Sequence, residues 1–426
     1  MNKKVFMVFG LVVIFSIVVL GNWCFSAEKE PIKIGLIGAL SAPYGVTDKT
    51  ALEISIEELN KEGGILGRPV KLIVEDWKRE VPLAVAAYKK LVMTDKCLAV
   101  FTEGTEGTTA CMQEASRLYP EFPHLQFGFW TAHEGLTDPV CAQYDKYKFF
   151  FRVYSKTGDT FDPKLANWNL FKKVIGTKKM ALVIEDIGWT QPYIKGVEGK
   201  HLPLKEFYEE KGMKIVYYGK SAVGEKMFLP IFEKIAASGA DTIHWITGYS
   251  DTITMAKQWA ESAAKDLDMV AFSGACSYAA FWKMTGGASL GWASLDPEVP
   301  IPFTDKTAPF LKELKNRGAG VVSSAYGAYD GPWIIKAAVE KVGHTNDVGA
   351  IIKALESVEV KHGFWTWKFD ACHDPLKGFP YFPTIFGQFQ KDGNYVCVFP
   401  EELRKMANPK EKYVHVKELR AKAAQK

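Results

Sequence analysis

Residues Leu59–Asp76 read L-N-K-E-G-G-I-L-G-R-P-V-K-L-I-V-E-D and join the end of one predicted helix to a predicted strand. Apolar side chains at helical spacing predict a helix over 48–61, and Gly63-Gly64 ends it because glycine readily adopts the positive φ angles of a helix C-cap. Gly67-Arg68-Pro69 predicts a tight turn, and the apolar run from Val70 predicts a strand that ends at an acidic pair. Helix, turn and strand in such close succession are typical of an α/β fold.

The same alternation extends in both directions from this stretch. In the first part of the chain, strands are predicted at 32–40, 70–74, 97–101 and 124–128, with helices at 81–92 and 108–118. After Val153 the pattern begins again, with strands at 180–185, 214–218, 242–246 and 269–272 and helices at 167–174, 193–211 and 228–238. Strands that alternate with helices form βαβ units on a largely parallel sheet. Because 426 residues are too many for one compact core, we expect two α/β lobes.

The pattern loosens after Gly274. Residues 282–303 are rich in Gly, Ser, Trp and Pro and are interpreted as irregular loop, whereas 307–317, 325–342 and 348–357 are predicted helices. A hairpin is predicted over 384–399, with a turn at Lys391–Asn394. The charged segment 401–426 is interpreted as a surface helix or a frayed end.

The N-terminus has the layout of a secretory signal. Lys3 and Lys4 precede an apolar run over 5–20, and small or polar residues follow it. The run is shorter than the ~20 residues that span a bilayer, so we expect a cleaved signal peptide over 1–26 and a periplasmic protein rather than a permanent anchor. Cys24 leaves acylation as an alternative, although Trp23 is large where lipoproteins carry a small residue.

Export places six further cysteines in an oxidising compartment: Cys97, Cys111, Cys141, Cys276, Cys372 and Cys397. None forms a C-x-x-C pair, so neither a zinc nor a redox motif is supported. Our pairing hypothesis is Cys111–Cys141 and Cys372–Cys397, and buried free thiols are the alternative.

Composition and motifs argue against several function classes. A net charge of +4, from 53 basic and 49 acidic residues, gives no reason to expect nucleic acid as a partner. The chain contains no G-x-S-x-G, H-E-x-x-H or P-loop motif and no G-x-G-x-x-G after a strand, and its eight histidines are dispersed. We therefore expect a protein that is not an enzyme and that uses no metal and no cofactor.

The opening stretch resembles the branched-chain amino-acid-binding family of periplasmic binding proteins, the receptors of ABC importers. That family carries a helix ending in N-x-x-G-G-I-x-G-R, followed by a strand that ends in an acidic pair. Further matching segments occur in the family's order over residues 31–399. They are Ile34–Ser41 followed by Gly45, Phe151-Arg152, Glu185–Trp189 and Ala325–Asp330.

The resemblance implies a type I periplasmic binding fold, with three crossover segments between the lobes and a ligand cleft at the carboxyl ends of the strands. It implies a monomeric receptor that closes on a small molecule and delivers it to the membrane subunits of an ABC importer. On this basis we expect lobe I to comprise 31–152 and 277–357, lobe II 153–276 and 358–399, and a tail 400–426. A stand-alone sensor domain of the same fold is the alternative.

The loops after the predicted strands supply the candidate ligand-binding residues. These are Ser41, Tyr44, Thr105, Glu106, Phe129, Trp130, Thr131, Tyr154, Trp189, Tyr249, Asp251 and Cys276. The family has mostly Ser and Thr where Glu103 and Glu106 stand. Either these carboxylates face away from the ligand, with Glu106 serving the first turn of its helix, or the ligand carries hydrogen-bond donors or positive charge. Phe129 and Trp130 suggest a stacking wall, with a core aromatic pair as the alternative.

One departure from the family pattern bears on the ligand. Ser273-Gly274-Ala275-Cys276 stands where the amino-acid binders place an acid that holds the ammonium group. An α-amino acid would lack this partner, and an unpaired buried charge is costly. We therefore expect an aromatic or apolar carboxylate or amide as ligand, with an amino-acid-like ligand as the alternative.

Overall fold

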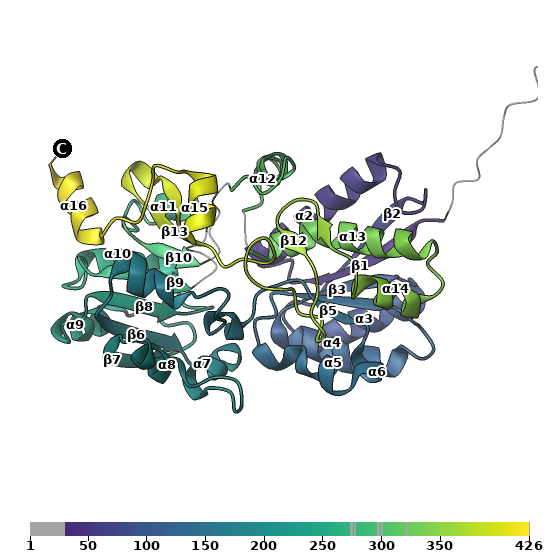
Figure 1. Ribbon diagram of the computed structural model, residues 1–426, viewed down its shortest axis with the longest axis horizontal. Helices are drawn as coiled ribbons and strands as arrows, with labels where there is room; N and C mark the ends of the chain where they lie inside the picture. Colours follow the sequence, from purple (N-terminus) through teal and green to yellow (C-terminus); the bar gives the residue numbers. More distant parts are fainter. Residues whose placement is uncertain are drawn as a thin grey trace, which may run out of the picture.

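The computed structural model describes residues 30–272, 276, 278–295, 299, 301–320 and 323–425. The predicted signal segment, Cys24 and the stretch 273–275 lie outside these ranges. The described chain forms two lobes, each built on its own sheet, and the lobes lie side by side in Figure 1. None of the helices in the described ranges combines the length and apolar character needed to cross a bilayer.

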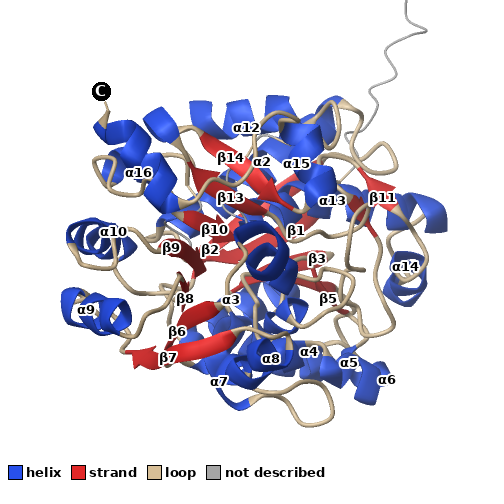
Figure 2. Ribbon diagram, turned by 60° about the vertical axis from the view of Figure 1, so that its left-hand side comes forward, coloured by secondary structure: helices blue, strands red, loops and turns tan. Residues whose placement is uncertain are grey.

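The first lobe contains a five-stranded parallel sheet in the order β2-β1-β3-β4-β5. Its strands are β1 (Ile32–Gly38), β2 (Val70–Asp76), β3 (Ala99–Glu103), β4 (Leu125–Phe129) and β5 (Phe150–Arg152). Helices α2 (Pro43–Lys61) and α13 (Ser323–Val342) pack together on one face, and α3 (Val81–Lys89) and α4 (Thr105–Leu118) on the other (Figures 1 and 2). The lobe also carries α5 (Asp138–Ala142), α6 (Tyr144–Tyr147), α12 (Thr307–Asn316) and α14 (Val348–Leu355). Because helices cover both faces, every residue of β3 and β4 is buried.

The second lobe contains a seven-stranded sheet in the order β14-β13-β10-β9-β8-β6-β7. Its strands are β6 (Lys179–Glu185), β7 (Lys214–Ser221), β8 (Thr242–Ile246), β9 (Asp268–Phe272), β10 (Ala293–Leu295), β13 (Phe386–Phe389) and β14 (Tyr395–Phe399). Strands β6, β7, β8, β9 and β10 are parallel, and the β13–β14 hairpin adds two antiparallel strands at one edge. The helices of this lobe are α7 (Gln191–Lys195), α8 (Leu204–Glu210), α9 (Leu229–Ala237), α10 (Thr252–Glu261), α11 (Phe281–Met284), α15 (Glu401–Ala407) and α16 (Val416–Ala424). The predicted α/β class and the predicted hairpin are confirmed.

Three predicted elements differ from the structure. The single helix over 193–211 is two helices, α7 and α8, because Gly196 has a φ of 72° and Pro203 precedes the second one. The supposed loop 282–303 contains β10, whose three residues are too few to show a period but pair with β9 and β13. The tail packs against the second lobe, where Leu403 and Val416 are fully buried.

The chain crosses between the lobes three times: between β5 and β6, between β10 and α12, and between the small β11–β12 sheet (Val360–Lys361 and Thr366–Trp367) and β13. The expected boundary at 276/277 is wrong, since α11 and β10 still belong to the second lobe. The expected boundary at 357/358 is also too early. Asp330 of α13 accepts hydrogen bonds from the Gly363 N–H (2.8 Å) and from Trp367 Nε1 (2.8 Å), which ties that segment to the first lobe.

The crossovers are held by buried charge. Arg152, at the end of β5, is fully buried, and its Nε lies 2.8 Å from Asp374 Oδ1 of the third crossover. The ammonium group of Lys156 also contacts Asp374. Although burial alone would raise it, the Arg152 and Lys156 cations hold the pKa of Asp374 at about 2.

The disulfide pairing differs from both predicted pairs. Cys141 of α5 is bonded to Cys372, across 231 residues of sequence, and this bond fastens the first lobe to the third crossover. Cys111 is buried in α4, where its thiol faces the Ala84 carbonyl, and Cys397 is buried in β14. Neither predicted pair forms, because Cys141 and Cys372 bond to each other and Cys111 and Cys397 remain free thiols.

Candidate functional site

A cavity of about 730 Å³ lies between the lobes at the carboxyl ends of the parallel strands. We call it the cleft. The first lobe lines it with the loops after β1, β2, β3 and β4, and the second with the loops after β6, β7, β8 and β9. Both lobes thus contribute the same end of their sheets, which is where open α/β sheets bind ligands.

Aromatic rings form both walls of the cleft. On the first lobe, the ring centroids of Tyr44 and Trp130 are 5.3 Å apart, and those of Trp130 and Tyr154 are 5.5 Å apart. On the second lobe, Trp189 and Phe272 lie 5.7 Å apart. Two facing aromatic walls favour a flat, largely apolar ligand.

The second wall depends on the loop after β8. Buried Glu185 holds this loop, because its Oε2 accepts hydrogen bonds from the N–H groups of Gly248 (2.6 Å) and Tyr249 (3.0 Å). A Cβ atom on Gly248 would stand 3.0 Å from Trp189 Nε1. Glycine at 248 therefore lets the indole of Trp189 lie against the backbone.

Arg79 stands at the mouth of the cleft. It follows β2, has a φ of 62°, and its guanidinium carbon lies 4.5 Å from the ring centroid of Tyr249 on the other lobe. Within the described residues it forms no ion pair with a carboxylate. An arginine fork that faces a cavity and has no acidic partner matches the geometry of a ligand carboxylate.

Two carboxyl groups are buried beside the cleft. Glu103, at the end of β3, lines the cavity and is only 2% exposed, and Asp48 of α2 is fully buried. Glu103 Oε2 accepts a hydrogen bond from the Ala39 N–H (3.0 Å), and Asp48 Oδ1 accepts one from Ser324 (2.5 Å). Glu103 Oε1 has no hydrogen-bond partner among the described residues, whereas a hydrogen bond from the Trp130 side chain acts to lower the pKa of Asp48.

Burial controls the charge of this pair. It raises the pKa of Glu103 to about 8, against the lowering effect of the Ala39 N–H and of Arg79. Burial and the neighbouring Glu103 likewise raise the pKa of Asp48. The inner end of the cleft therefore disfavours negative charge on both groups.

The family follows from comparison with known proteins. A family model described as periplasmic binding protein matches residues 31–394. This chain belongs to the periplasmic binding protein family. The Leu/Ile/Val-binding protein homolog 3 of Brucella melitensis is 25% identical over 337 residues, which are 78% of this chain and 84% of that protein.

Solved structures share the fold of this periplasmic binding protein. The Leu-, Ile-, Val-, Thr- and Ala-binding protein of Brucella ovis, in a closed conformation, has a TM-score of 0.70, 18% identity, and coverage of 86% of this chain and 94% of its own. A branched-chain amino acid transporter substrate-binding protein of Streptococcus pneumoniae, with isoleucine, has a TM-score of 0.68, 19% identity, and coverage of 87% and 100%. An ABC transporter solute-binding protein of R. palustris, with 4-hydroxybenzoate, has a TM-score of 0.66, 19% identity, and coverage of 86% and 95%. The expected type I periplasmic binding fold is confirmed.

In this periplasmic binding protein, seven of the residues singled out in the sequence line the cleft. They are Tyr44, Thr105, Glu106, Trp130, Tyr154, Trp189 and Tyr249. Glu106 lies in the first turn of α4 and also faces the second lobe, because its Oε1 would be 3.7 Å from a Cβ atom on Gly188. Glu106 therefore faces the cleft from the first turn of its helix.

The other five lie outside the lining. Ser41 is exposed. Phe129 is buried against Phe101 in the core, which agrees with the alternative of a core aromatic for this residue. Thr131 is buried, and its carbonyl accepts from Arg152. Asp251 caps α10 through the Thr254 N–H, and the carbonyl of buried Cys276 accepts from Ser294. All five sit close to a strand end in sequence, but Phe129, Thr131 and Cys276 are buried outside the lining and Asp251 caps a helix.

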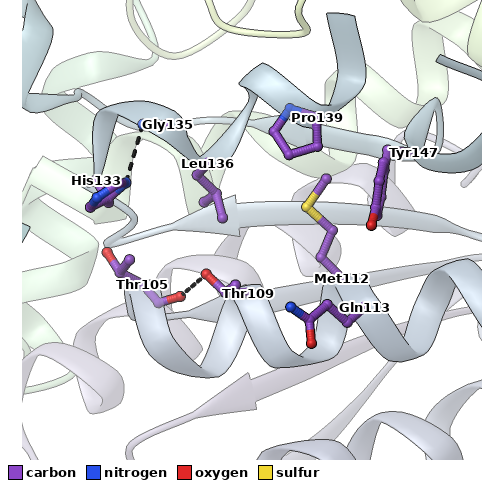
Figure 3. Close-up of a pocket in the computed structure, with 9 residues that line it drawn as sticks. All are labelled: Thr105, Thr109, Met112, Gln113, His133, Gly135, Leu136, Pro139 and Tyr147. Carbon is purple, nitrogen blue, oxygen red and sulfur yellow. Dashed lines mark hydrogen bonds between the residues drawn. The ribbon is translucent and has the colours of Figure 1, made fainter. Parts of the chain in front are cut away.

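A second, smaller cavity adjoins the cleft on the first lobe. Its volume is about 330 Å³, and it lies between α4 and the segment that leads into α5 and α6 (Figure 3). Thr105 lines both cavities, so the first turn of α4 separates them. None of the nine described residues that line it is a lysine, an arginine or a carboxylate.

Sequence reasoning missed several residues of the cleft, notably Trp77, Arg79, Phe272 and Tyr278. Trp77 and Arg79 directly follow the predicted strand after the quoted glycine motif. The strand-end rule that selected the other loops would have found them there. Tyr278 carries no such signal, because it reaches the cleft from the segment after β9.

Proposed function

We propose that this protein is the periplasmic solute-binding receptor of an ABC importer, and that its ligand is a small aromatic or flat apolar carboxylate. The observation that carries the ligand class is Arg79, a guanidinium that has no acidic partner among the described residues and stands at the mouth of a cleft with aromatic walls. Its fork would take the carboxylate, and Trp130 and Trp189 would enclose the ring.

The relatives support this proposal at a coarser level. Those compared above are named for branched-chain amino acids or were solved with isoleucine or 4-hydroxybenzoate, so the fold accepts both ligand types. In this chain Cys276 stands where the amino-acid binders carry an ammonium partner, and the side chain of Cys276 is buried away from the cleft. An aromatic carboxylate needs no such partner.

The remaining parts of the proposal follow from the family. The receptor would be exported and cleaved, act as a monomer, close on its ligand without turning it over, and dock on the importer's membrane subunits. The amide ligands that the sequence left open are less favoured, since an amide gives Arg79 no charge to neutralise.

A thermal-shift panel on the mature protein tests the ligand class. Benzoate, 4-hydroxybenzoate, benzamide, leucine, isoleucine and acetate are compared at equal concentration. We expect the two aromatic carboxylates to raise the melting temperature and benzamide to leave it unchanged, because only a ligand that binds the folded state stabilises it. A shift with leucine or isoleucine alone would refute the aromatic-carboxylate proposal. Turnover of a bound compound, detected by mass spectrometry, would refute the receptor role.

A further inference from the structure

Glu103 combines burial with an unused hydrogen-bonding atom. Glu103 lines the cleft and is only 2% exposed. Its Oε2 accepts a hydrogen bond from the Ala39 N–H at 3.0 Å, whereas its Oε1 has no hydrogen-bond partner among the described residues. Buried polar atoms are nearly always hydrogen-bonded in native proteins. A ligand that supplies a partner to Oε1 therefore gains more than one that leaves it unpaired.

The groups around Glu103 restrict the charge of that partner. Asp48 and Tyr44 approach it from α2, and Asp76 and Arg79 from the end of β2 and the loop beyond it. Burial raises the pKa of Glu103 to about 8 and keeps the carboxyl largely neutral at pH 7. A hydroxyl group pairs with either form, since it accepts from a neutral carboxyl and donates to a carboxylate. An ammonium group pairs well only with the carboxylate.

The sheet places Glu103 and Arg79 at opposite ends of one binding site. Strand β1 lies between β2 and β3, so the strand ends that precede Arg79 and carry Glu103 are about two strand spacings apart, or ~10 Å. Arg79 is exposed at the mouth, whereas Glu103 is buried at the floor. Tyr44, which belongs to the aromatic wall of the first lobe, also lines this site. One aromatic ring with polar groups at its two ends fits this arrangement.

We propose that Glu103 is a specificity-determining residue that selects aromatic carboxylates bearing a hydroxyl group at the end remote from the carboxylate, through a hydrogen bond to Oε1. The inference rests on the proposed function, since it assumes that the carboxylate lies at Arg79. It adds the second polar group of the ligand and the residue that recognises it.

Isothermal titration calorimetry with three ligands tests this on the full mature chain. Benzoate carries no group at the remote end, 4-methylbenzoate carries one of similar size that cannot hydrogen-bond, and 4-hydroxybenzoate carries the hydroxyl. We expect the wild-type protein to bind 4-hydroxybenzoate at least about tenfold more tightly than either of the others. Equal affinities for the three would overturn the assignment of Glu103 and leave the proposed function standing. No binding of any of them would overturn both.

Three variants assign the preference to Glu103. E103L should abolish the preference for the hydroxyl-bearing ligand, because it removes the carboxyl oxygen that pairs with the hydroxyl. E103Q should keep most of the preference, since an amide also pairs with a hydroxyl, and it remains informative if E103L does not fold. E114L removes a largely buried carboxylate of α4 outside the cleft and should leave the preference unchanged. A preference that survives in E103L would overturn the proposal.

Discussion

The guanidinium group of Arg79 on the first lobe lies over the ring of Tyr249 on the second lobe, 4.5 Å from its centroid. This contact joins the first-lobe and second-lobe edges of the cleft and places the cation at the mouth of the cleft. It therefore connects closure of the lobes with recognition of an anionic ligand.

Replacing Arg79 should weaken anionic ligands selectively. We expect R79Q to lower benzoate affinity by about tenfold or more, and R79K to lie between R79Q and wild type because lysine keeps the charge but loses the fork. The melting temperature without ligand should change little, since Arg79 is exposed. Calorimetry and thermal denaturation provide the two measurements, and unchanged benzoate affinity in R79Q would contradict the role given to Arg79.

Gly248 should be intolerant of a side chain in the binding assay. In G248A the new Cβ stands 3.0 Å from Trp189 Nε1 and displaces the indole, so we expect aromatic ligands to bind about five- to tenfold more weakly. The matched control is G188A in the neighbouring loop, where a Cβ would meet only Glu106 Oε1 at 3.7 Å. Similar affinities of the two variants would show that Trp189 does not contact the ligand.

The ion pair of Arg152 and Asp374 should dominate the stability of the hinge. D374N leaves the buried Arg152 cation without its counterion, and we expect the free energy of unfolding to fall by about 3–5 kcal/mol in urea. The pKa of Asp374 is lowered to about 2, so its contribution is present above the ordinary Asp pKa and is lost as the pH falls toward 2. D392N, at an exposed turn, is the control and should match wild type.

Reduction of the Cys141–Cys372 bond should destabilise the protein. The disulfide closes a long loop, so we expect the C141A/C372A double variant to lose about 2–5 kcal/mol of unfolding free energy. Thiol titration of the unreduced protein should find Cys97, Cys111, Cys276 and Cys397 reactive only after denaturation, because all four are buried. Peptide mapping that joined Cys111 to Cys141 would instead restore the pairing predicted from the sequence.

The lobes are also joined by His201 of the second lobe and Glu134 of the first, whose Nε2 and Oε2 atoms are 2.7 Å apart. Burial is the largest single effect and lowers the pKa of His201, but the hydrogen bonds to Glu134 and the Leu202 carbonyl, together with the charge of Glu134, raise it overall. Its contribution is therefore present below the ordinary His pKa and is lost as the pH rises through the raised value. We expect H201N to lower stability by about 1 kcal/mol at pH 5.5 and by less at pH 9, measured by urea unfolding. A pH-independent effect would show that the stacking of His201 on Phe161, at 3.7 Å, is what matters.

The regular βαβ segments could be predicted because their information is local. The helix before Gly63 and the strand after Pro69 lie close to their predicted limits, as does the β13–β14 hairpin. β10 was missed because three residues carry no periodicity and its pairing partners lie as far away as Gln388. The predicted helix at 193–211 is too long because the hydrophobic pattern of the sequence continues across Gly196 and Pro203.

The sequence by itself determined the α/β class, the two-lobed organisation, the family resemblance and the loops from which the cleft is built, since periodicity and glycine turns act over a few residues. Only the tertiary structure decided that Cys141 meets Cys372, that Arg79 reaches Tyr249, and that Glu103 is buried with one oxygen unpaired within the described part of the chain. The physical reason is that strand order and lobe closure set these contacts, and both depend on pairings between residues far apart in the chain.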